Sequence, residues 1–257
     1  MKHKKQDITA LIIVYNEINH IDELISHLDF VSEIIVIDSF SNDGTFEKLN
    51  TYPHVKTIQH KFLDFANQRN FAIEQASKEW ILFIDADERI SLELKKEILA
   101  LLHNVSDINA FKFRRKFIFQ NKIIRFSGLQ TDKIYRLFRK GTAFYLENKL
   151  VHEQLVVDGK TATLKNYLLH YSFINTQHYK SKTEDYARLK ARELFSKKLV
   201  PNWYHFYIKP IYKFISNYIF RLGFLDGKLG YIICKLNAYG VWFRYQELKR
   251  LYLSPKF

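Results

Sequence analysis

The sequence predicts an α/β protein in which a mainly parallel sheet is flanked by helices and followed by a C-terminal helical extension. Over the first hundred residues, short runs of β-branched residues alternate with helical patterns. Nearly continuous apolar strands are typical of a parallel sheet that helices cover on both faces. The alternation then stops, and the end of the chain is helical in pattern. We therefore expect a domain over residues 1–180, with halves 1–108 and 109–180, and an extension over 181–257.

The front half carries four expected strands, each followed by an expected helix. The strands are the apolar runs Ile8–Val14, Glu33–Asp38, Val55–Ile58 and Trp80–Ile84. The helices are Glu17–Leu28, Asp43–Leu49, Phe65–Ala76 and Leu92–Leu102. Ser91 is the expected N-cap of the last helix. Because strands and helices alternate, we expect parallel strands whose carboxyl ends meet at one edge of the sheet, where such folds bind ligands.

The back half mixes further strands with long helices. Strands, some of them antiparallel, are expected at Phe111–Phe119, Ile134–Phe138 and Leu150–Val157, with turns at Gly141 and Gly159. Helices are expected at Lys182–Lys197, Tyr204–Leu222 and Leu229–Leu251, in a region punctuated by Pro201 and Pro210. A helix break or a closely packed turn is expected around Asp226, at Gly223, Gly227 and Gly230.

Charge is divided unevenly along the chain. Residues 1–110 hold 11 Lys and Arg against 18 Asp and Glu, a net charge of −7. Residues 111–257 hold 29 against 9, a net charge of +20. Such asymmetry indicates contact with an anionic surface or ligand. The single cysteine, Cys234, excludes an intrachain disulfide and a zinc site built on cysteine pairs.

Neither a signal peptide nor a transmembrane helix is expected. The first apolar run ends at Asn16 and Glu17 without a small-residue cleavage site. The longest stretch without charged residues, Asn166–Tyr179, has 14 residues and is polar, whereas a membrane span needs about 18 apolar residues. We expect a cytoplasmic protein that is peripheral on the inner face of the cytoplasmic membrane.

Glycine placement excludes the common nucleotide-binding loops. Gly44 is the one glycine within residues 1–127. The G-x-G-x-x-G loop of dinucleotide-binding folds and the G-x-x-x-x-G-K-[ST] loop of P-loop enzymes both need more than one glycine. Neither site is therefore expected in the front half.

Acidic and polar residues follow the expected strands instead. The strand ends read Tyr15-Asn16-Glu17, Asp38-Ser39-Phe40-Ser41-Asn42-Asp43 and Asp85-Ala86-Asp87-Glu88. Carboxylates gathered at one sheet edge repel each other unless a cation joins them, and oxygen ligands suit Mg²⁺ or Mn²⁺. The alternative is structural, because an isolated Asp-x-Asp is commonly turn chemistry and Asp38 and Asp43 are typical turn and N-cap residues. The three strand ends together favour a metal site.

The motifs ALIIVYNE, EIIVIDSFSNDGT, ANQRNFAI and WILFIDADE resemble those of family 2 glycosyltransferases with the Rossmann-like GT-A fold. The later strings IYRLFRKG, LVHEQL, LHYSF and FRLGFLDGKLGY resemble the branch that adds β-1,4-linked glucose to heptose in the lipopolysaccharide inner core. The resemblance covers nearly the whole chain. It implies a catalytic domain over 1–180, with a nucleotide-sugar half and an acceptor half. It also implies inverting transfer of a sugar, expected to be glucose, from a UDP-sugar to a membrane glycolipid.

The resemblance implies roles for individual residues at the donor site. The residues expected to contact the nucleotide-sugar are Tyr15, Asn16, Glu17, Asp38, Arg69, Asn70 and Asp85. Among these, Asp38 would receive the uracil near Tyr15, and Asp85 would face the ribose or the donor sugar. Asp87 is the expected direct ligand of Mn²⁺ or Mg²⁺, which stabilises the departing diphosphate.

A carboxylate on the acceptor side is implied as the base that deprotonates the acceptor hydroxyl. Glu153 is the candidate, Glu147 is the alternative, and Asp132 is a weaker one. The E-D pair of many family members is missing from this sequence, so the assignment stays open. His152 is taken as a further metal ligand, with His170 as the alternative, although a lone histidine is more often a packed, hydrogen-bonded residue.

Two sets of cations suggest anionic partners. Arg136 and Arg139 suit phosphate contacts, with a solvated strand face as the alternative. Residues 201–257 hold nine Lys and Arg, two Asp and Glu and sixteen aromatic residues. This composition is typical of an interfacial helix at an anionic membrane, and it also suits binding of an anionic glycolipid. Because aromatic residues also pack helices together, we expect one face packed and one face at the membrane.

Other hypotheses change the acceptor or the class of protein. The acceptor can instead be another surface polysaccharide or a protein. A sugar nucleotidyltransferase typically has a Gly-rich, Arg-containing loop after the first strand, where this chain has Val14-Tyr15-Asn16-Glu17. A non-catalytic protein that binds an anionic membrane or nucleic acid would suit the positive charge. No RNP-type or helix-turn-helix signature is present, however, so no nucleic-acid partner is expected.

Overall fold

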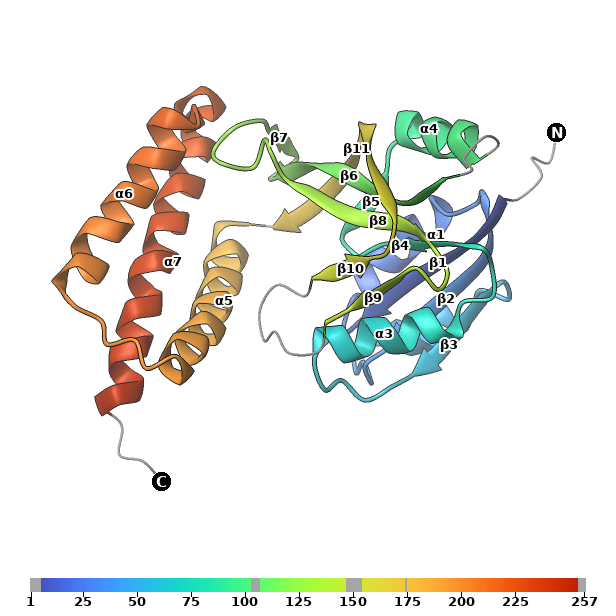
Figure 1. Ribbon diagram of the computed structural model, residues 1–257, viewed down its shortest axis with the longest axis horizontal. Coiled ribbons are helices and arrows are strands. Elements are labelled where there is room, and N and C mark those ends of the chain that lie inside the picture. The colour runs from blue at the N-terminus through green and yellow to red at the C-terminus, as the bar shows by residue number, and fades with distance from the viewer. Residues whose placement is uncertain (1–5, 103–106, 147–153, 174, 254–257) are drawn as a thin grey trace. The chain divides into compact units, whose positions relative to one another are not determined.

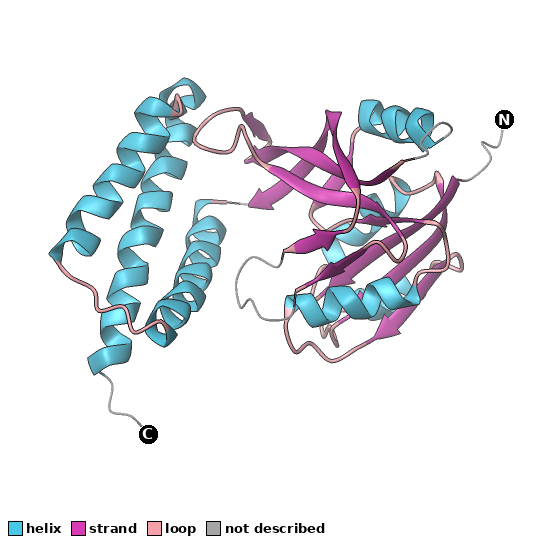
Figure 2. Ribbon diagram, in the orientation of Figure 1, coloured by secondary structure: helices cyan, strands magenta, loops and turns pink. Residues whose placement is uncertain are grey.

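The computed structural model of the chain describes residues 6–102, 107–146, 154–173 and 175–253. The chain divides into two compact units. The first comprises residues 1–115 and 132–170, and the second comprises residues 116–131 and 171–257. The sequence-based boundary at residue 180 falls inside helix α5 (Thr176–Ser196), all of which belongs to the second unit. The second unit is mostly helical in Figure 2, whereas the first mixes strands and helices.

Four parallel strands form one half of the sheet in the first unit (Figure 1). They are β1 (Gln6–Val14), β2 (Val31–Asp38), β3 (Val55–Gln59) and β4 (Trp80–Phe83). Their spatial order is β3-β2-β1-β4, and each neighbouring pair is parallel. The register pairs Val14 with Asp38 at the ends of β1 and β2. The predicted parallel sheet is therefore confirmed, and the polar strand ends meet at one edge.

Antiparallel strands continue the sheet beyond β4. They are β8 (Lys133–Arg139), β6 (Ile108–Phe119), β11 (Lys160–Phe173) and β5 (Glu88–Ile90), with β7 (Lys122–Ile124) paired to β6. β8 is antiparallel to both β4 and β6, and β5 is antiparallel to β11. A separate two-stranded sheet joins β9 (Ala143–Tyr145) to β10 (Leu155–Val157). Within the described residues, β10 is thus shorter than the strand expected over 150–157.

Short helices follow the parallel strands. They are α1 (Ile21–Ser26), α2 (Thr45–Leu49), α3 (Phe65–Gln75) and α4 (Leu92–Leu102). The helix expected at 17–28 is instead a 3₁₀ turn followed by α1. Ser91 caps α4 as predicted, because its Oγ accepts a hydrogen bond from the Leu94 N–H at 3.2 Å. Asp64 caps α3 in the same way, accepting from the Asn67 N–H at 2.8 Å.

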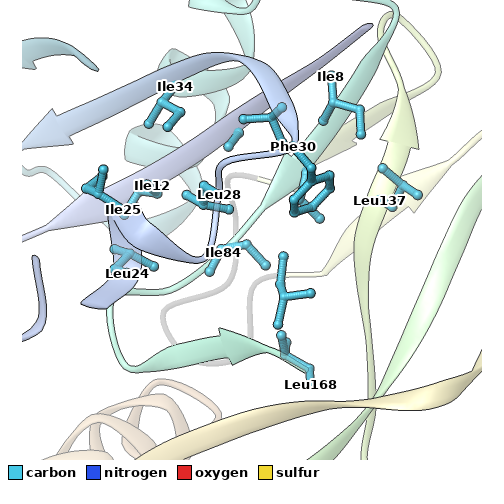
Figure 3. Packing of buried hydrophobic residues seen from close by; sticks show 14 of the residues in the cluster. Ile8, Ile12, Leu24, Ile25, Leu28, Phe30, Ile34, Ile84, Leu137 and Leu168 are labelled. Atoms are coloured by element: carbon cyan, nitrogen blue, oxygen red, sulfur yellow. The ribbon is translucent and has the colours of Figure 1, made fainter. Parts of the chain in front are cut away.

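Both faces of the parallel sheet are buried. Figure 3 shows the core on one face, where Ile8 and Ile12 of β1 lie among residues such as Leu24 and Leu28. Leu11, between them in sequence, belongs to the core on the opposite face, as the two-residue period of a strand requires. Burial on both faces explains why these strands read as continuous apolar runs rather than as alternating ones.

Three helices dominate the second unit. Helix α7 (Gly227–Leu253) packs against α5 and α6 (Lys209–Ile215), and the three lie side by side in Figure 1. Within the described residues, no helix is long and apolar enough to cross a membrane. The predicted break before α7 is confirmed. A Cβ on Gly230 would lie only 2.0 Å from the carbonyl oxygen of Gly223, so the close approach requires glycine there.

Asp226 fixes the start of α7 within the second unit. Its carboxylate accepts hydrogen bonds from the N–H groups of Arg125 and Phe126 and from the hydroxyl of Ser127, at 2.9–3.0 Å. The segment 116–131, which contains β7, is thereby joined to the helices although it is remote from them in sequence.

Candidate active site

Hydrogen bonds join the loops that follow β1 and β2. The Asn16 N–H donates to Ser41 Oγ, and the Asn42 N–H donates to Asn16 Oδ1, both at 2.9 Å. Asp43 accepts from the Ile18 N–H at 3.2 Å and from the Thr45 N–H at 3.0 Å. Asp43 therefore has the turn and capping role that its residue type allows. The side chain of Asn16 orders the loop, and its contact with a nucleotide-sugar stays a prediction.

Asp38 provides a buried carboxylate at the end of β2. It accepts hydrogen bonds from the Ser41 N–H at 3.2 Å and from Gln59 Nε2 at 3.1 Å. Tyr15, at the end of β1, is 57% exposed and so offers its ring to solvent or to a ligand. Asp38 and Tyr15 thus end neighbouring strands, as expected for a binding site at the sheet edge.

Gln68 of α3 extends this polar edge. Its Nε2 donates to Ser39 Oγ at 3.0 Å, and its Oε1 lies 2.8 Å from His60 Nδ1. The side chain is fully buried, so its position is set by these partners. Gln68 was not among the predicted site residues, because a glutamine within a helical pattern has no local sequence signal of its own.

Two arginines hold Asp85 at the end of β4. Arg69 Nη2 donates to Asp85 Oδ1 at 2.9 Å, and Arg136 pairs with the other oxygen, Oδ2. Arg136 also donates to Glu88 Oε1 at 2.8 Å, and neither Arg136 nor Glu88 is exposed to solvent. Glu88 Oε2 accepts from the Asp85 N–H at 3.1 Å, which closes the network around the loop.

This network keeps Asp85 ionised. Burial by itself would raise the pKa of Asp85, but the guanidinium groups of Arg136 and Arg69 hold it well below its usual range. Burial would likewise lower the pKa of Arg136, and Asp85 and Glu88 instead raise it above its ordinary value. The two arginine charges offset the charges of Asp85 and Glu88. Asp87 of the same loop has a different partner, the imidazole of His170.

Arg69 and Asn70 of α3 are positioned by neighbours on β4 and β9. The guanidinium of Arg69 lies 4.6 Å from the ring centroid of Phe83 and 5.4 Å from that of Tyr145. The amide of Asn70 donates to the Tyr145 carbonyl and accepts from the Tyr145 N–H, both at 2.8 Å. Asn70 thus attaches α3 to β9. Direct contact of Arg69 and Asn70 with the donor remains a prediction.

Asp87 lies beside a histidine from a distant strand. Its Oδ1 is 3.3 Å from Nε2 of His170, and the two side chains are 18% and 13% exposed. The pairing of β11 with β5, in which His170 is opposite Glu88, brings them together. The carboxylate oxygen suits Mg²⁺ or Mn²⁺, and an imidazole nitrogen beside it favours the transition metal Mn²⁺ over Mg²⁺.

The donor set fits a cation that is shared with its substrate. Among the described residues, no group of three or more His, Cys, Asp and Glu could hold a metal ion by itself. Mg²⁺ typically takes one or two carboxylates and completes its coordination with water and substrate phosphates. Asp87 and His170 match that pattern. The predicted residues Glu147, His152 and Glu153 lie outside the described residues.

Three further candidates are engaged in ion pairs. Asp132 accepts from Arg115 Nε at 2.5 Å. Arg139 pairs with Glu79, and its guanidinium lies 4.6 Å from a ring centroid of Trp80. Arg136 belongs to the buried network described above, so the solvated strand face considered for it is wrong. Its buried position could not be read from the sequence because the partners Asp85 and Glu88 are about fifty residues away.

Glu88, like Gln68, is a residue of this site that was not predicted from the sequence. It was noted only as the last letter of the acidic run, yet it anchors both Asp85 and Arg136. Its neighbour Arg89 is also buried, with Nε 3.1 Å from Glu23 Oε2. The feature that reveals Glu88 and Arg89 is their burial in a three-residue strand. Charged residues are rarely buried without partners, so their burial indicates an ion network.

Comparisons with known proteins agree with this geometry. The sequence model described as glycosyl transferase family 2 matches residues 9–159. The lipopolysaccharide core biosynthesis glycosyltransferase LpsC of Rhizobium meliloti is 26% identical over 253 residues, which covers 94% of each chain. This identity shows that the two chains are related over most of their length.

Two solved structures share the fold. Staphylococcus aureus TarS 1-349 in complex with UDP has a TM-score of 0.52 at 16% identity, covering 98% of this chain and 93% of that one. The mannosyltransferase PcManGT of Pyrobaculum calidifontis, in complex with GDP-Man and Mn²⁺, has a TM-score of 0.50 at 14% identity, covering 100% and 78%. At these identities the likeness concerns the GT-A fold alone.

Proposed function

The chain belongs to glycosyl transferase family 2, and on this premise we propose that it transfers a sugar from a UDP-sugar to a membrane glycolipid. The sugar is expected to be glucose, and the acceptor a heptose of the lipopolysaccharide inner core. The loop after β4 carries the proposal, because Asp85 is fixed between two arginines while Asp87 faces His170. Similarity to a lipopolysaccharide core glycosyltransferase over 94% of both chains supports the acceptor class.

The donor nucleotide is proposed to bind at the ends of β1 and β2. Asp38 would accept a hydrogen bond from the uracil, and the exposed ring of Tyr15 would lie beside the base. Asn16 and Glu17 are in the loop that follows Tyr15, and Arg69, Asn70 and Asp85 would face the ribose or the sugar. A structure with the same fold that binds UDP supports this choice of nucleotide.

Asp87 and His170 are proposed to hold Mn²⁺ or Mg²⁺, and His152 remains the alternative histidine. The bound cation would supply positive charge to the diphosphate leaving group. The arginines have a complementary role. Since Arg69 and Arg136 offset Asp85 and Glu88, the loop does not repel the diphosphate with three uncompensated carboxylates.

The transfer step is proposed to be a single displacement with inversion. The acceptor hydroxyl loses its proton to Glu153 while its oxygen attacks the anomeric carbon of the donor. The bond from that carbon to the UDP oxygen breaks, and UDP leaves with the electron pair. Glu147 is the alternative base. Asp132 is less suited to that task because its carboxylate already accepts from Arg115.

The second unit is proposed to bring the protein to the acceptor membrane at the inner face of the cytoplasmic membrane. Among the described residues, the aromatic side chains that are more than half exposed there are Tyr186, Trp203, Tyr207, Tyr212 and Phe220. Tyr245 is buried in the same unit, so one set of aromatic residues is packed and another faces solvent. Exposed aromatic rings among lysines are typical of surfaces that bind at the membrane interface.

Donor binding tests the proposal separately from the acceptor. Thermal unfolding of the protein is followed with UDP-glucose, UDP-GlcNAc, other UDP-sugars and GDP-mannose, each with and without Mn²⁺. We expect a Mn²⁺-dependent rise of the unfolding midpoint with a UDP-sugar, which Asp87→Asn and His170→Asn reduce. Equal stabilisation by GDP-mannose, or no effect of any UDP-sugar, would contradict the donor assignment.

A further inference from the structure

A cavity lies among the three helices of the second unit. Its volume is about 240 Å³, and its lining comes from α5, α6 and α7. Three of the lining residues are cations: Lys182 of α5, Lys213 of α6 and Arg244 of α7. Hydroxyl and amide groups of Thr183 and Asn237 also line it. The residues proposed to bind the donor all belong to the first unit, so this is a separate site.

Two of the three cations of this cavity lack a carboxylate partner among the described residues. Within the described part of the chain, Lys213 and Arg244 form no ion pair, and the buried Nε of Arg244 has no hydrogen-bond acceptor. Lys182 donates to the carbonyl of Ser172 at 3.4 Å.

The acidic residues of α5 that could offset these charges are used elsewhere. Glu184 accepts from the Tyr239 hydroxyl at 2.7 Å and lies near Arg188. Glu193 accepts from Lys190 and Lys197 at 2.6 and 2.7 Å. Glu193 also attracts Arg244 without forming an ion pair with it. An anion that pairs directly with Lys213 and Arg244 therefore has to come from outside these pairs.

The environment of Lys213 and Arg244 makes their charges costly. Burial lowers the pKa of Lys213, and the positive charges of Arg221 and Arg244 lower it further. Burial also lowers the pKa of Arg244, although a guanidinium stays protonated in proteins. Like charges that face one cavity without a counter-charge destabilise the helices unless an anion binds between them.

We propose that this cavity binds a phosphate group. Arg244 would present its planar N–H groups to two phosphate oxygens, and Lys213 and Lys182 would act as point charges. The volume of about 240 Å³ is many times what one water molecule needs, so it admits a phosphate together with part of the molecule that carries it. The carrier is either a phosphorylated lipid headgroup or a soluble phosphate.

The surroundings of the cavity connect it to a surface. Tyr212, next to Lys213 on α6, is 66% exposed, as is Tyr207 one turn and a half earlier. A phosphorylated lipid headgroup in the cavity would thus have apolar and aromatic side chains of the same helix available for its lipid part. A soluble phosphate would use the cavity alone, which separates the two sources experimentally.

The test measures phosphate-dependent stability and vesicle binding of the full chain. Thermal unfolding is followed in inorganic phosphate, in pyrophosphate and in chloride of equal ionic strength. Pelleting uses phosphatidylcholine vesicles with and without phosphatidic acid. Arg244→Gln removes the fork of donors, and Lys213→Glu places an internal carboxylate opposite Arg244. Lys235→Gln is the matched control, since Lys235 is an exposed cation of α7 outside the cavity lining.

We expect binding in at least one assay, either of the soluble anions phosphate and pyrophosphate or of the vesicles that contain phosphatidic acid. The wild type and Lys235→Gln should bind equally in that assay. Arg244→Gln should bind about tenfold more weakly or worse, as expected for a lost charge-assisted hydrogen bond. Lys213→Glu should unfold at a higher temperature than the wild type in chloride and lose the phosphate effect. An effect of the soluble anions assigns a soluble phosphate, and an effect of vesicles alone assigns a lipid headgroup. Equal binding by all variants, or no binding in either assay, overturns the proposal.

Discussion

Asp85 and Asp87 are two residues apart and have opposite surroundings. Asp85 has an arginine on each carboxylate oxygen, whereas Asp87 lies beside His170. The arginines stabilise the charge of Asp85 and restrict its position. Asp87 retains a carboxylate that can bind a cation together with an imidazole. The division of labour within one Asp-x-Asp pair is thus set by residues on α3, β8 and β11.

Replacing Asp87 tests its proposed role as a ligand. Asp87→Asn keeps the size of the side chain and removes its charge. We expect transfer to fall by at least about a hundredfold while the unfolding midpoint without ligand stays close to wild type. Steady-state kinetics over a Mn²⁺ titration measures this. Asp29→Asn, at an exposed ion pair with Lys95, is the control. Wild-type turnover of Asp87→Asn would rule out the ligand assignment.

Arg136 pairs with two carboxylates of the loop after β4, Asp85 and Glu88. Arg136→Met removes the 2.8 Å partner of the buried Glu88 and leaves it the more distant Arg115, at 3.5 Å. We therefore expect a loss of up to about 3–5 kcal/mol, the cost of breaking a buried pair. Because the pKa of Asp85 is lowered in the folded state, its pairing stabilises the fold above about pH 4 and is lost as the pH falls further. The difference from wild type should therefore be constant from about pH 5 to 9 and shrink below about pH 4.

Urea unfolding at a series of pH values measures this difference. The control is Lys160→Met, which removes an exposed pair with Asp107 and should leave stability almost unchanged. An Arg136→Met variant that is as stable as the wild type at neutral pH would show that the ion network does not stabilise the loop after β4.

The sequence could predict the carboxylates of the site but not their partners. Asp38 and Asp85 follow apolar strands, so parallel pairing alone brings them to one edge of the sheet. The approach of His170 to Asp87 depends on antiparallel pairing of β11 with β5, which are about seventy residues apart. β5 has three residues, which are too few to show the two-residue period of a strand in the sequence. The sequence did not decide between His152 and His170 as the metal ligand, and that choice stays untested.

At the level of elements, the N-cap of α3 determines where Gln68 and Arg69 lie. Asp64→Ala removes the hydrogen bond to the Asn67 N–H and should lower the free energy of unfolding by about 1 kcal/mol. Asp64→Asn restores an accepting oxygen and is expected to be near wild type. Chemical denaturation of both variants measures this. Equal loss in Asp64→Asn would show that charge, rather than capping, accounts for the effect.

Long, periodic elements were predictable, and short or two-faced ones were not. The four parallel strands and α4 have strong local patterns, such as the cap at Ser91. α5 begins at Thr176, six residues before the expected start, because Asn175 caps it by accepting from the His178 N–H. β11 was not expected although it has 14 residues, and buried residues such as Leu164 and Leu168 alternate there with more exposed ones. That two-residue period is a strand signal, which the sequence does contain.

At the scale of the whole molecule, the charge division corresponds to two kinds of surroundings. The front segment has a net charge of −7, and part of it lies in the ion network at the end of β4. The back segment has a net charge of +20 and contains the helices of the second unit. An anionic membrane attracts such a segment with a strength that salt reduces.

Vesicle association tests the role of the exposed aromatic residues. The triple variant Trp203→Ser, Tyr207→Ser and Tyr212→Ser should bind anionic vesicles roughly tenfold more weakly or worse, because it loses apolar area that the interface buries. Binding of the wild type should also fall as salt is raised. Phe62→Ser, at an exposed ring of the first unit, should have no effect. Unchanged binding of the triple variant would assign these residues to another role.

Product analysis tests the central claim most directly. The protein is incubated with UDP-glucose, Mn²⁺ and a heptose-containing lipopolysaccharide core acceptor, and the acceptor mass is measured by mass spectrometry. We predict one added hexose with the wild type, and loss of that product by orders of magnitude in Glu153→Gln although UDP-glucose still binds. An acceptor that gains no sugar from any UDP-sugar, or a Glu153→Gln variant and a Glu147→Gln variant that both act at the wild-type rate, would contradict the account.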